Sequence, residues 1–370
     1  EFRRVLFRSI YCDFFSTTQS ERKTAYIHAV CSELEMRKEY LGGETIETIY
    51  WGGGTPSQLD KEDFETIFYY LHKNYSISSH PEITLEANPD DLTPDYIAML
   101  RTLPFNRLSM GIQTFNESIL KVLQRRHTAR QAIEAFQNCR AAGFQNISID
   151  LMYGLPGETL STWQQDLDQA LLLHPEHLSA YHLIYEEDTV LWKLREQHKV
   201  EEADEDLSVS LFSTLIDRLT SEGYDHYEIS NFSLPGLYSR HNSSYWTEKK
   251  YLGCGPSAHS YNGVSRQWNV ASLDTYIKGI SAGTPVFEIE ELDLYTRYND
   301  FVITRIRTEW GMPLSKLRDE FGEKLYDYCL RMAAPHLKQG TLELVNDILK
   351  LTRKGIFISD GIMSDMLWTD

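Results

Sequence analysis

An alternation of two kinds of segment most constrains the fold of this chain. From Ile46 to about Ile184, short runs rich in β-branched and aromatic residues alternate with longer amphipathic stretches. This order is typical of repeated βα units, whose strands lie parallel in one sheet. The predicted strands are Thr45–Trp51, Ile83–Ala87, Arg107–Gln113, Ile147–Tyr153 and Leu178–Ile184. The predicted helices include Gln19–Tyr40, Lys61–Lys73, Ala129–Ala142 and Thr159–Leu173. A further strand near Val5–Ile10 would complete six βα units, which favours an α/β fold with an open barrel.

A second, helix-rich region is predicted from about Glu290 to the end of the chain. Its predicted elements are the helices Leu294–Arg307, Pro313–Glu320 and Lys324–Gln339, the hairpin Leu342–Leu351 with its turn at Asn346–Asp347, and a last helix from about Arg353. Helices followed by a hairpin predict a small, winged-helix-like domain. That fold often binds DNA, but this region is not basic, so a lid or packing role is favoured.

Composition excludes several classes of protein. The net charge of −18 argues against a nucleic-acid ligand, because neutralising phosphates requires clustered Lys and Arg. No apolar run approaches the roughly 18 residues that indicate a membrane span, so no integral membrane segment is expected. The five cysteines are few and scattered, which indicates a reducing, cytoplasmic setting rather than a disulfide framework. The expected partners are a small molecule and another protein.

The segment Tyr50–Pro56 (YWGGGTP) is the most specific local motif. A predicted strand runs directly into Gly52, Gly53 and Gly54, where backbone amides and carbonyls can approach a ligand without intervening side chains. A tight turn is the alternative reading, since the motif lacks the GxGxxG and GKS/T forms that bind nucleotides.

Polar residues lie at the ends of three other predicted strands. They are Glu86, Gln113 and Asp150. In βα barrels the carboxyl ends of the strands converge on the ligand, so these side chains are predicted to meet in one pocket. A helix cap or turn explains any one of them alone, but Asp150 inside a buried strand is hardest to explain in that way.

The order of five segments resembles the radical S-adenosylmethionine (SAM) core of the HemN/HemW family. The segments read GGGTP, LEANP, RLSMGIQTF, LKVLQRRH and IDLMYGLPGET, and the similarity extends over most of the chain from Ile10 onward. The resemblance implies a partial (β/α)6 TIM-like barrel of the radical SAM type, followed by the C-terminal helical, winged-helix-like domain. It divides the chain into a damaged or non-native terminus at 1–9, a core at 10–230, a connecting segment at 231–289 and a C-terminal domain at 290–370.

The same resemblance assigns residues to bound SAM. It implies that Gly53, Gly54 and Thr55 contact the methionyl group. It further implies that Glu86 contacts polar atoms of SAM, that Gln113 and Arg125 contact the bound molecule, and that Asp150 contacts the ribose. Carboxylates accept hydroxyl hydrogen bonds and arginine pairs with carboxylates, so the residue types suit these roles. Arg126 is an adjacent alternative to Arg125.

The family holds a [4Fe–4S] cluster on a C-x3-C-x2-C motif, of which this chain keeps only the third cysteine. The segment Ile10–Phe15 matches the end of the motif, so Cys12 is the implied metal ligand. The other two positions hold Val5 and Ser9, which are not thiolate ligands. The mismatch coincides with the arginine-rich segment Glu1–Ser9, which favours replacement of the native terminus over an evolved cluster-free protein.

Two features resemble the heme-chaperone branch of the family. Phe14 stands where the oxidase branch typically has a further cysteine, and His241–Trp246 (HNSSYW) matches the HNxxYW motif associated with heme binding. The resemblance implies that His241 ligates heme iron while Tyr245 and Trp246 supply flat apolar surface. A structural, hydrogen-bonded histidine is the alternative. Secondary candidates near the same cavity are Cys254, His259, Tyr181 and His182.

Three functions follow from the sequence. The leading one is a heme chaperone on a radical SAM scaffold that passes heme to an acceptor protein, with the [4Fe–4S] cluster, SAM and heme as cofactors. The second is oxygen-independent coproporphyrinogen III oxidase, an enzyme of heme biosynthesis. The third is a nonenzymatic binding module on a relic barrel, which predicts no SAM affinity.

Overall fold

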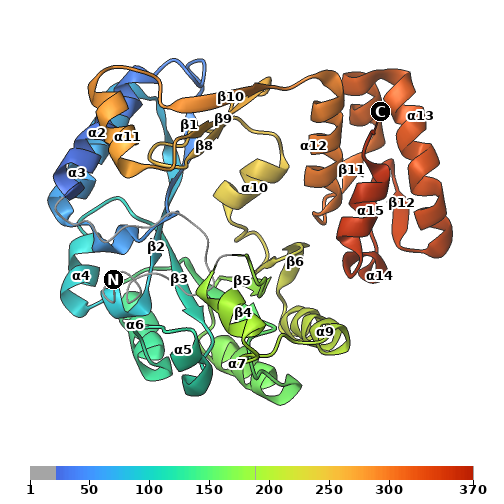
Figure 1. Cartoon of the computed structure of the whole chain (residues 1–370), viewed down its shortest axis with the longest axis horizontal. Coiled ribbons are helices and arrows are strands. Elements are labelled where there is room, and N and C mark those ends of the chain that lie inside the picture. Colours follow the sequence, from blue (N-terminus) through green and yellow to red (C-terminus); the bar gives the residue numbers. More distant parts are fainter. Residues whose placement is uncertain (1–21, 188, 370) are drawn as a thin grey trace.

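A seven-stranded sheet forms the centre of the computed structural model, which describes residues 22–187 and 189–369. Its strand order is β1-β2-β3-β4-β5-β7-β6 (Figure 1). The first five strands are parallel, and β7 and β6 continue the sheet antiparallel. The strands are β1 (Ile46–Trp51), β2 (Ile77–Ala87), β3 (Arg107–Gln113), β4 (Ile147–Tyr153), β5 (His177–His182), β6 (Asp225–Glu228) and β7 (Asn231–Ser233). The strand predicted near Val5–Ile10 lies outside the described residues.

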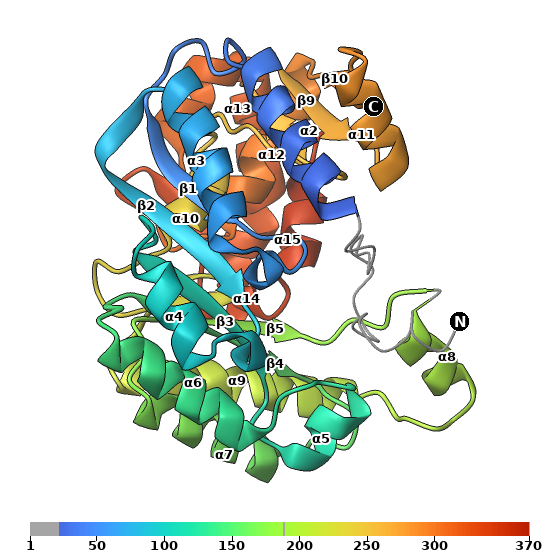
Figure 2. The ribbon, with the colours of Figure 1, turned by 90° about the vertical axis from the view of Figure 1, so that its left-hand side faces the viewer.

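Helices cover the outer face of this sheet, as Figure 2 shows for α3, α4, α6 and α7. The helices up to β6 are α2 (Lys23–Met36), α3 (Lys61–Asn74), α4 (Pro94–Leu100), α5 (Glu117–Val122), α6 (Ala129–Ala141), α7 (Leu160–Leu172), α8 (Val190–Glu196) and α9 (Glu205–Ser221). Three of them begin with a capping box, in which the N-cap side chain and the side chain three residues later bond each other's backbone N–H groups. These local signals explain why the helix starts at Lys61, Ala129 and Leu160 agree with the sequence prediction to within one residue.

The buried core of the sheet is dominated by large apolar side chains. Trp163, Phe64 and Phe136 are fully buried between the strands and the outer helices. The Trp163 indole N–H donates to the carbonyl of Leu211 at 3.0 Å, so its polar group is satisfied inside the core. The α/β partial barrel predicted from the sequence is therefore confirmed, with an antiparallel β7–β6 extension that was not predicted.

A second sheet lies across the opening of the curved first sheet. It has three antiparallel strands in the order β10-β9-β8, which are β8 (His259–Tyr261), β9 (Ser265–Asn269) and β10 (Phe287–Glu291). Helices α10 (Arg240–Trp246) and α11 (Leu273–Ser281) flank it. The sequence analysis predicted none of these strands.

Glu33 on α2 joins this second sheet to the barrel. One of its carboxylate oxygens accepts from Asn269 at 2.7 Å and from Arg37 at 3.3 Å. The other accepts from the Tyr276 hydroxyl at 2.7 Å and from the backbone N–H of Gly255 at 2.9 Å. Glu33 is 1% exposed, so Arg37, four residues along the chain, and three donors from distant segments satisfy one buried carboxylate.

The C-terminal unit has its own apolar core, to which Phe301, Leu317 and Met366 contribute. Its elements are α12 (Leu294–Ile306), β11 (Met312–Pro313), α13 (Leu314–Gln339), β12 (Leu342–Val345), β13 (Ile348–Leu351), α14 (Arg353–Ile356) and α15 (Ser359–Met366). The two helices predicted between Pro313 and Gln339 are both present and meet at Gly322, whose φ of 79° and ψ of 171° are not helical; they share the label α13. The predicted helical domain with a hairpin is confirmed. The predicted end of the core at 230 and the predicted start of the C-terminal domain at 290 stay a proposal.

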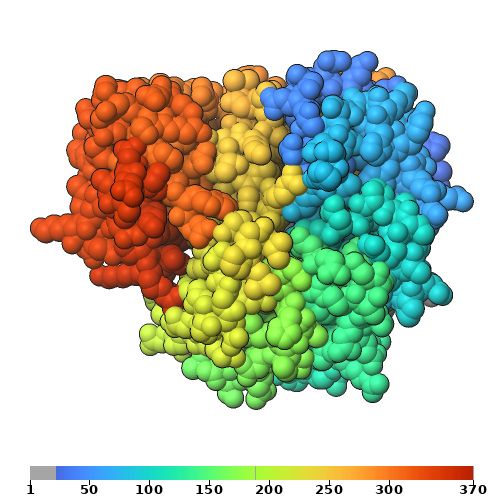
Figure 3. Space-filling view, turned by 180° about the vertical axis from the view of Figure 1, so that it is seen from behind, coloured from blue at the N-terminus to red at the C-terminus, as the bar shows by residue number. Residues whose placement is uncertain are grey.

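Backbone contacts join the C-terminal unit to the barrel. Thr308 forms a β-bridge with Glu228 at the end of β6, and the N–H of Glu309 donates to the carbonyl of Tyr227 at 3.0 Å. Arg307 lies 3.5 Å from the buried carboxylate of Glu228. In Figure 3 the C-terminal unit, in orange and red, lies directly beside the yellow part of the chain.

Within residues 22–187 and 189–369, no helix combines the length and apolar character needed to cross a bilayer. The cytoplasmic setting expected from the composition stays a prediction.

Candidate functional site

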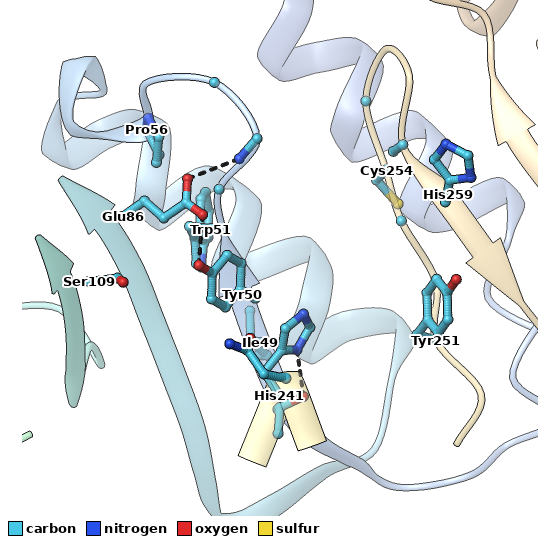
Figure 4. Close-up of a pocket in the computed structure, with 18 of the residues that line it drawn as sticks. Ile49, Tyr50, Trp51, Pro56, Glu86, Ser109, His241, Tyr251, Cys254 and His259 are labelled. Carbon is cyan, nitrogen blue, oxygen red and sulfur yellow. Dashed lines mark hydrogen bonds between the residues drawn. The ribbon is translucent and has the colours of Figure 1, made fainter. Parts of the chain in front are cut away.

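A large cavity of about 3310 Å³ lies between the inner face of the main sheet and the segment that follows α10. Its lining includes the carboxyl ends of the parallel strands on one side and residues 240–259 on the other. Figure 4 shows this arrangement, with Glu86, Tyr50 and His241 on one wall and Cys254 and His259 across from them. The cavity therefore brings both groups of sequence-predicted residues to one space.

Glu86 organises the glycine motif at the end of β1. Its carboxylate accepts a hydrogen bond from the Tyr50 hydroxyl at 2.7 Å and one from the backbone N–H of Gly53 at 3.1 Å. A Cβ atom at Gly52 would lie 2.5 Å from the Tyr50 ring and 2.6 Å from the Glu86 carboxylate, so only glycine fits there. Burial raises the pKa of Glu86, and the nearby Asp150 carboxylate adds to this effect. The motif is thus a backbone cradle held by a buried carboxyl group.

Asp150 lies next to this cradle, at the middle of β4. The Ser109 hydroxyl on β3 donates to it, with distances of 3.1 and 3.2 Å to the two carboxylate oxygens. Burial raises the pKa of Asp150, while its hydrogen bonds and Arg107 oppose that shift. Gln113 ends β3 in the left-handed region with φ 72° and lines the same pocket. A residue other than glycine with this backbone marks a position held by its surroundings.

The two adjacent arginines after α5 have different surroundings. The Arg125 guanidinium donates to the side chain of Asn88 at 2.8 Å and to the carbonyl of Gly111 at 2.7 Å, at the ends of β2 and β3. Arg126 pairs with Asp90 and Asp91 at 2.9 and 3.1 Å and is partly exposed. Both line the cavity, but only Arg125 is bonded to the strand ends beside Gln113.

His241 lies in the first turn of α10 and is held on every side. Its backbone N–H and that of Arg240 donate to the Glu82 carboxylate at 2.9 and 3.0 Å. Nδ1 lies 2.9 Å from the Thr48 hydroxyl, and Nε2 lies 3.0 Å from the Tyr245 hydroxyl. Burial lowers the pKa of His241 to about 4, with a further contribution from the positive charge of Arg107. The imidazole is therefore neutral at pH 7.

Tyr245 and Trp246 take different positions at the end of the same helix. Tyr245 lines the cavity and is 37% exposed. Trp246 does not belong to the lining; the guanidinium of Arg307 lies 4.1 Å from the centroid of its ring. The structure brings Tyr245 to the cavity and turns Trp246 toward the C-terminal unit, where it has no access to a ligand in the cavity.

The secondary candidates also line the cavity. Cys254 and His259 lie on the wall opposite His241, and burial raises the pKa of the Cys254 thiol well above its usual value. Tyr181 and His182 lie at the end of β5, where His182 Nε2 is 3.0 Å from the Ser208 hydroxyl. A thiol that stays protonated is a poor metal ligand, so His241 and His259 are the better candidates.

The predicted cluster ligand Cys12 lies outside the described residues, as do Val5, Ser9 and Phe14. Of the described residues, no three His, Cys, Asp or Glu side chains come close enough to hold a metal ion. The described cysteines are on different elements, and Cys31, Cys139 and Cys329 are buried. The described part of the chain therefore provides no substitute for the missing cluster ligands.

The sequence analysis did not assign Thr48, Tyr50, Glu82 and Arg107 to the site. They are polar residues of strands β1, β2 and β3: Thr48, Tyr50 and Arg107 line the cavity with Glu86 and Ser109, and Glu82 holds the backbone of α10. Period-two alternation within the predicted strands was the available signal, because alternate side chains of a strand point to the same face.

Comparisons with known proteins agree with this geometry. The model of the radical SAM superfamily matches residues 7–170, and the HemN C-terminal domain matches residues 292–358. The heme chaperone HemW of Mycobacterium tuberculosis is 31% identical, over 98% of this chain and 92% of that protein. HemW of Bacillus subtilis is 30% identical, over 96% and 95% respectively.

A solved structure shares the fold. The coproporphyrinogen III oxidase HemN of Escherichia coli, a radical SAM enzyme, superimposes with a TM-score of 0.83 over 97% of this chain and 86% of that chain. The two sequences are 22% identical, so this likeness concerns the fold alone. The full-length similarity to the bacterial relatives, together with the two matched domains, shows that the chain belongs to the HemW family of radical SAM proteins.

Proposed function

We propose that this protein binds heme at His241 and delivers it to an acceptor protein, on a scaffold that also binds SAM. The observation that carries this proposal is the state of His241: a neutral, oriented imidazole on the wall of a large cavity. When Nδ1 donates its proton to Thr48, Nε2 carries the lone pair that heme iron needs. The relatives in bacteria are named heme chaperones, which supports the same reading.

Ligation requires one local rearrangement. The Tyr245 hydroxyl lies 3.0 Å from Nε2 and occupies the direction from which iron would approach. Tyr245 is partly exposed, so its side chain can rotate away at the cost of one hydrogen bond of about 1 kcal/mol. Tyr245 would then control the access of iron to Nε2 and would also contact the macrocycle.

The residues at the strand ends fit SAM. The backbone at Gly53–Thr55 would hold the methionyl group, Glu86 would accept from its polar atoms, and Asp150 would accept from ribose hydroxyls. Gln113 and Arg125 complete this pocket at the end of β3. Nothing lies within 4 Å of a Cβ at Gly53 or Gly54, so the backbone there is open to a ligand.

The cluster does not fit the sequence as it stands. With Val5 and Ser9 at two of three ligand positions, Cys12 provides one thiolate. We therefore derive no step of the function through the cluster, and the proposed heme binding and SAM binding are assigned to the residues named above.

Heme titration followed by absorption spectroscopy tests the proposal. The wild-type chain is expected to shift the heme Soret band, and His241→Ala is expected to lose or change that shift. His80→Ala is the matched control, because His80 is an exposed histidine on β2. An identical spectrum and affinity in His241→Ala would exclude His241 as the ligand and would leave His259 as the histidine to test.

Tyr245→Phe sharpens the test. This change removes the hydroxyl that bonds Nε2 but keeps the ring, so heme affinity is expected to stay equal or rise. Transfer is tested by mixing the heme-loaded chain with apomyoglobin and following the spectrum. Decarboxylation of coproporphyrinogen III by the same preparation would instead support the oxidase function.

A further inference from the structure

Arg107 is a buried cation inside the barrel with no bonded partner among the described residues. It is the first residue of β3, is 2% exposed and lines the large cavity. Its Nε atom is buried without a hydrogen-bond partner. No hydrogen bond or ion pair joins its guanidinium to another residue within 22–187 or 189–369. Buried arginines are almost always paired, so this one needs an explanation.

The strand register places Arg107 at the level of His241. Arg107 pairs with Thr84 on β2, and Thr84 pairs with Tyr50 on β1. The Tyr50 ring is stacked on the His241 imidazole, with centroids 4.6 Å apart. Four residues from three strands and α10 thus share one layer of the barrel interior.

The same register places Arg107 at the opposite end of β3 from Gln113. Gln113 lies six residues further along β3, which corresponds to about 20 Å of extended strand. Arg125 already lies at that far end, bonded to the carbonyl of Gly111. The carboxylate of a SAM molecule paired with Arg125 would therefore lie away from Arg107, while Asp150, the candidate ribose ligand, lies close enough for the charge of Arg107 to oppose its raised pKa.

The charge of Arg107 shifts the pKa of other groups in the barrel interior. It contributes to lowering the pKa of His241 and of the fully buried His177, after burial itself. The charge of Arg107 opposes the raised pKa of Asp150, but the Asp150 carboxylate accepts from Ser109 and forms no ion pair with Arg107 within the described residues. A ligand anion would complete this charge balance.

We propose that Arg107 binds a carboxylate of the ligand that enters the barrel, and that this carboxylate is a propionate of the tetrapyrrole. The proposal rests on the proposed heme function, since it supplies the second anchor of the same ligand. A guanidinium forms two parallel hydrogen bonds to a carboxylate, which fixes orientation as well as position. With iron at His241 and a propionate at Arg107, the macrocycle would lie across the layer beside Tyr50.

The test compares heme with heme dimethyl ester, in which both propionates are neutral. The wild-type chain is expected to bind heme about tenfold or more tightly than the ester. Arg107→Met is expected to bring the two affinities together by weakening heme alone, and Arg107→Lys, which keeps the charge without the fork, is expected to lie between. Thermal melting and circular dichroism verify that each variant is folded, and the wild-type comparison stands without any variant.

The outcomes separate this inference from the proposed function. Equal affinities of the wild-type chain for heme and its ester would overturn the inference and leave the heme function intact. Parallel weakening of both ligands in Arg107→Met would assign Arg107 a structural role and also overturn it. A wild-type chain that binds neither porphyrin would overturn both proposals. Equilibrium dialysis with SAM gives the last comparison. A loss of SAM binding in Arg107→Met, with porphyrin binding unchanged, would show that the carboxylate bound by Arg107 is that of SAM, and would overturn the inference.

Discussion

The ring of Tyr50 stacks on the imidazole of His241 at a centroid distance of 4.6 Å and an interplanar angle of 15°, as seen in Figure 4. Its hydroxyl at the same time donates to Glu86 at 2.7 Å. One side chain thus touches both the candidate SAM pocket and the candidate heme ligand. The two functions of Tyr50 can be separated, because the ring and the hydroxyl contact different groups.

Tyr50→Phe removes the hydroxyl and keeps the stacked ring. Glu86 then loses one of its two donors, so SAM affinity is expected to fall about ten- to a hundredfold, from the roughly 1.5–3 kcal/mol of a hydrogen bond to a charged group. The heme spectrum is expected to stay unchanged. Equilibrium dialysis and absorption spectroscopy measure the two effects, and Tyr69→Phe on the exposed face of α3 is the control. Equal SAM affinity in Tyr50→Phe would show that this bond does not support the pocket.

Gly52→Ala tests the glycine cradle. The added Cβ would lie within 2.6 Å of Tyr50 and Glu86, so the strand end has to shift and SAM binding is expected to be lost. Gly361→Ala in α15 is the control, since nothing lies within 4 Å of a Cβ there and the residue does not line the cavity. The same dialysis measurement compares them. Similar SAM affinities in the two variants would contradict the cradle.

Glu33→Ala is expected to destabilise the fold by about 3–5 kcal/mol, because Arg37 and three further buried donors lose the carboxylate that accepts their hydrogen bonds. Glu35→Ala on the same helix removes an exposed ion pair with Lys73 and is expected to leave the stability nearly unchanged, because solvent screens the pair. Urea unfolding followed by circular dichroism compares the variants. Equal midpoints would show that the Glu33 network adds nothing beyond a surface pair.

Glu158 is expected to make stability fall with rising pH. Burial raises its pKa to about 8, so between the unfolded value near 4.5 and about pH 8 the folded chain holds one more proton than the unfolded chain. Stability is therefore lost as pH rises through this window, by up to about 1.4 kcal/mol per pH unit for one group. Glu158→Gln mimics the protonated form, because its amide oxygen still accepts from the N–H groups of Gly154 and Leu155.

Urea unfolding at pH 6.5 and 8.5 measures this effect. The wild-type chain is expected to lose stability between the two pH values, and Glu158→Gln is expected to lose less. An identical pH dependence in both proteins would place the titrating group elsewhere, with Asp166 as the nearby buried carboxyl group.

The elements with strong local signals could be predicted from the sequence. β3 and β4 are bounded as expected, since each is a buried run of apolar residues with polar residues at its end. The hairpin turn at Asn346–Asp347 was also correct, because both residues adopt the positive φ of a tight turn, at 50° and 69°.

The missed elements have weak local signals. Strands β6 and β7 are short and polar, and the pairing of β7 with β5 joins residues more than 50 positions apart. Strand β8 has only three residues and pairs with β9 in a three-stranded sheet that no local pattern indicates. Such pairings are decided by tertiary packing, which overrides local propensity.

The candidate site was predictable as a set of residues but not as a set of contacts. Strand ends place Glu86 and Gln113 together by a general rule of βα folds, and Asp150 lines the same pocket from the middle of β4. The partners of His241 could not be derived in this way, because Thr48 and Glu82 reach it across nearly 200 and 160 positions of sequence. The orientation of Trp246 depends on Arg307 in another unit and was equally inaccessible.

The contacts of Thr308, Glu309 and Arg307 with β6 bear on how such proteins can be recombined. A C-terminal unit exchanged between relatives has to bring a cation for the buried Glu228 and a backbone edge that pairs with it. It also has to bring a guanidinium over Trp246, at the end of the helix that carries His241. A C-terminal unit chosen only for its own stable core would therefore leave the carboxylate of Glu228 without a cation. The chimera would lose stability at the contact between the two units, although each unit kept its own core.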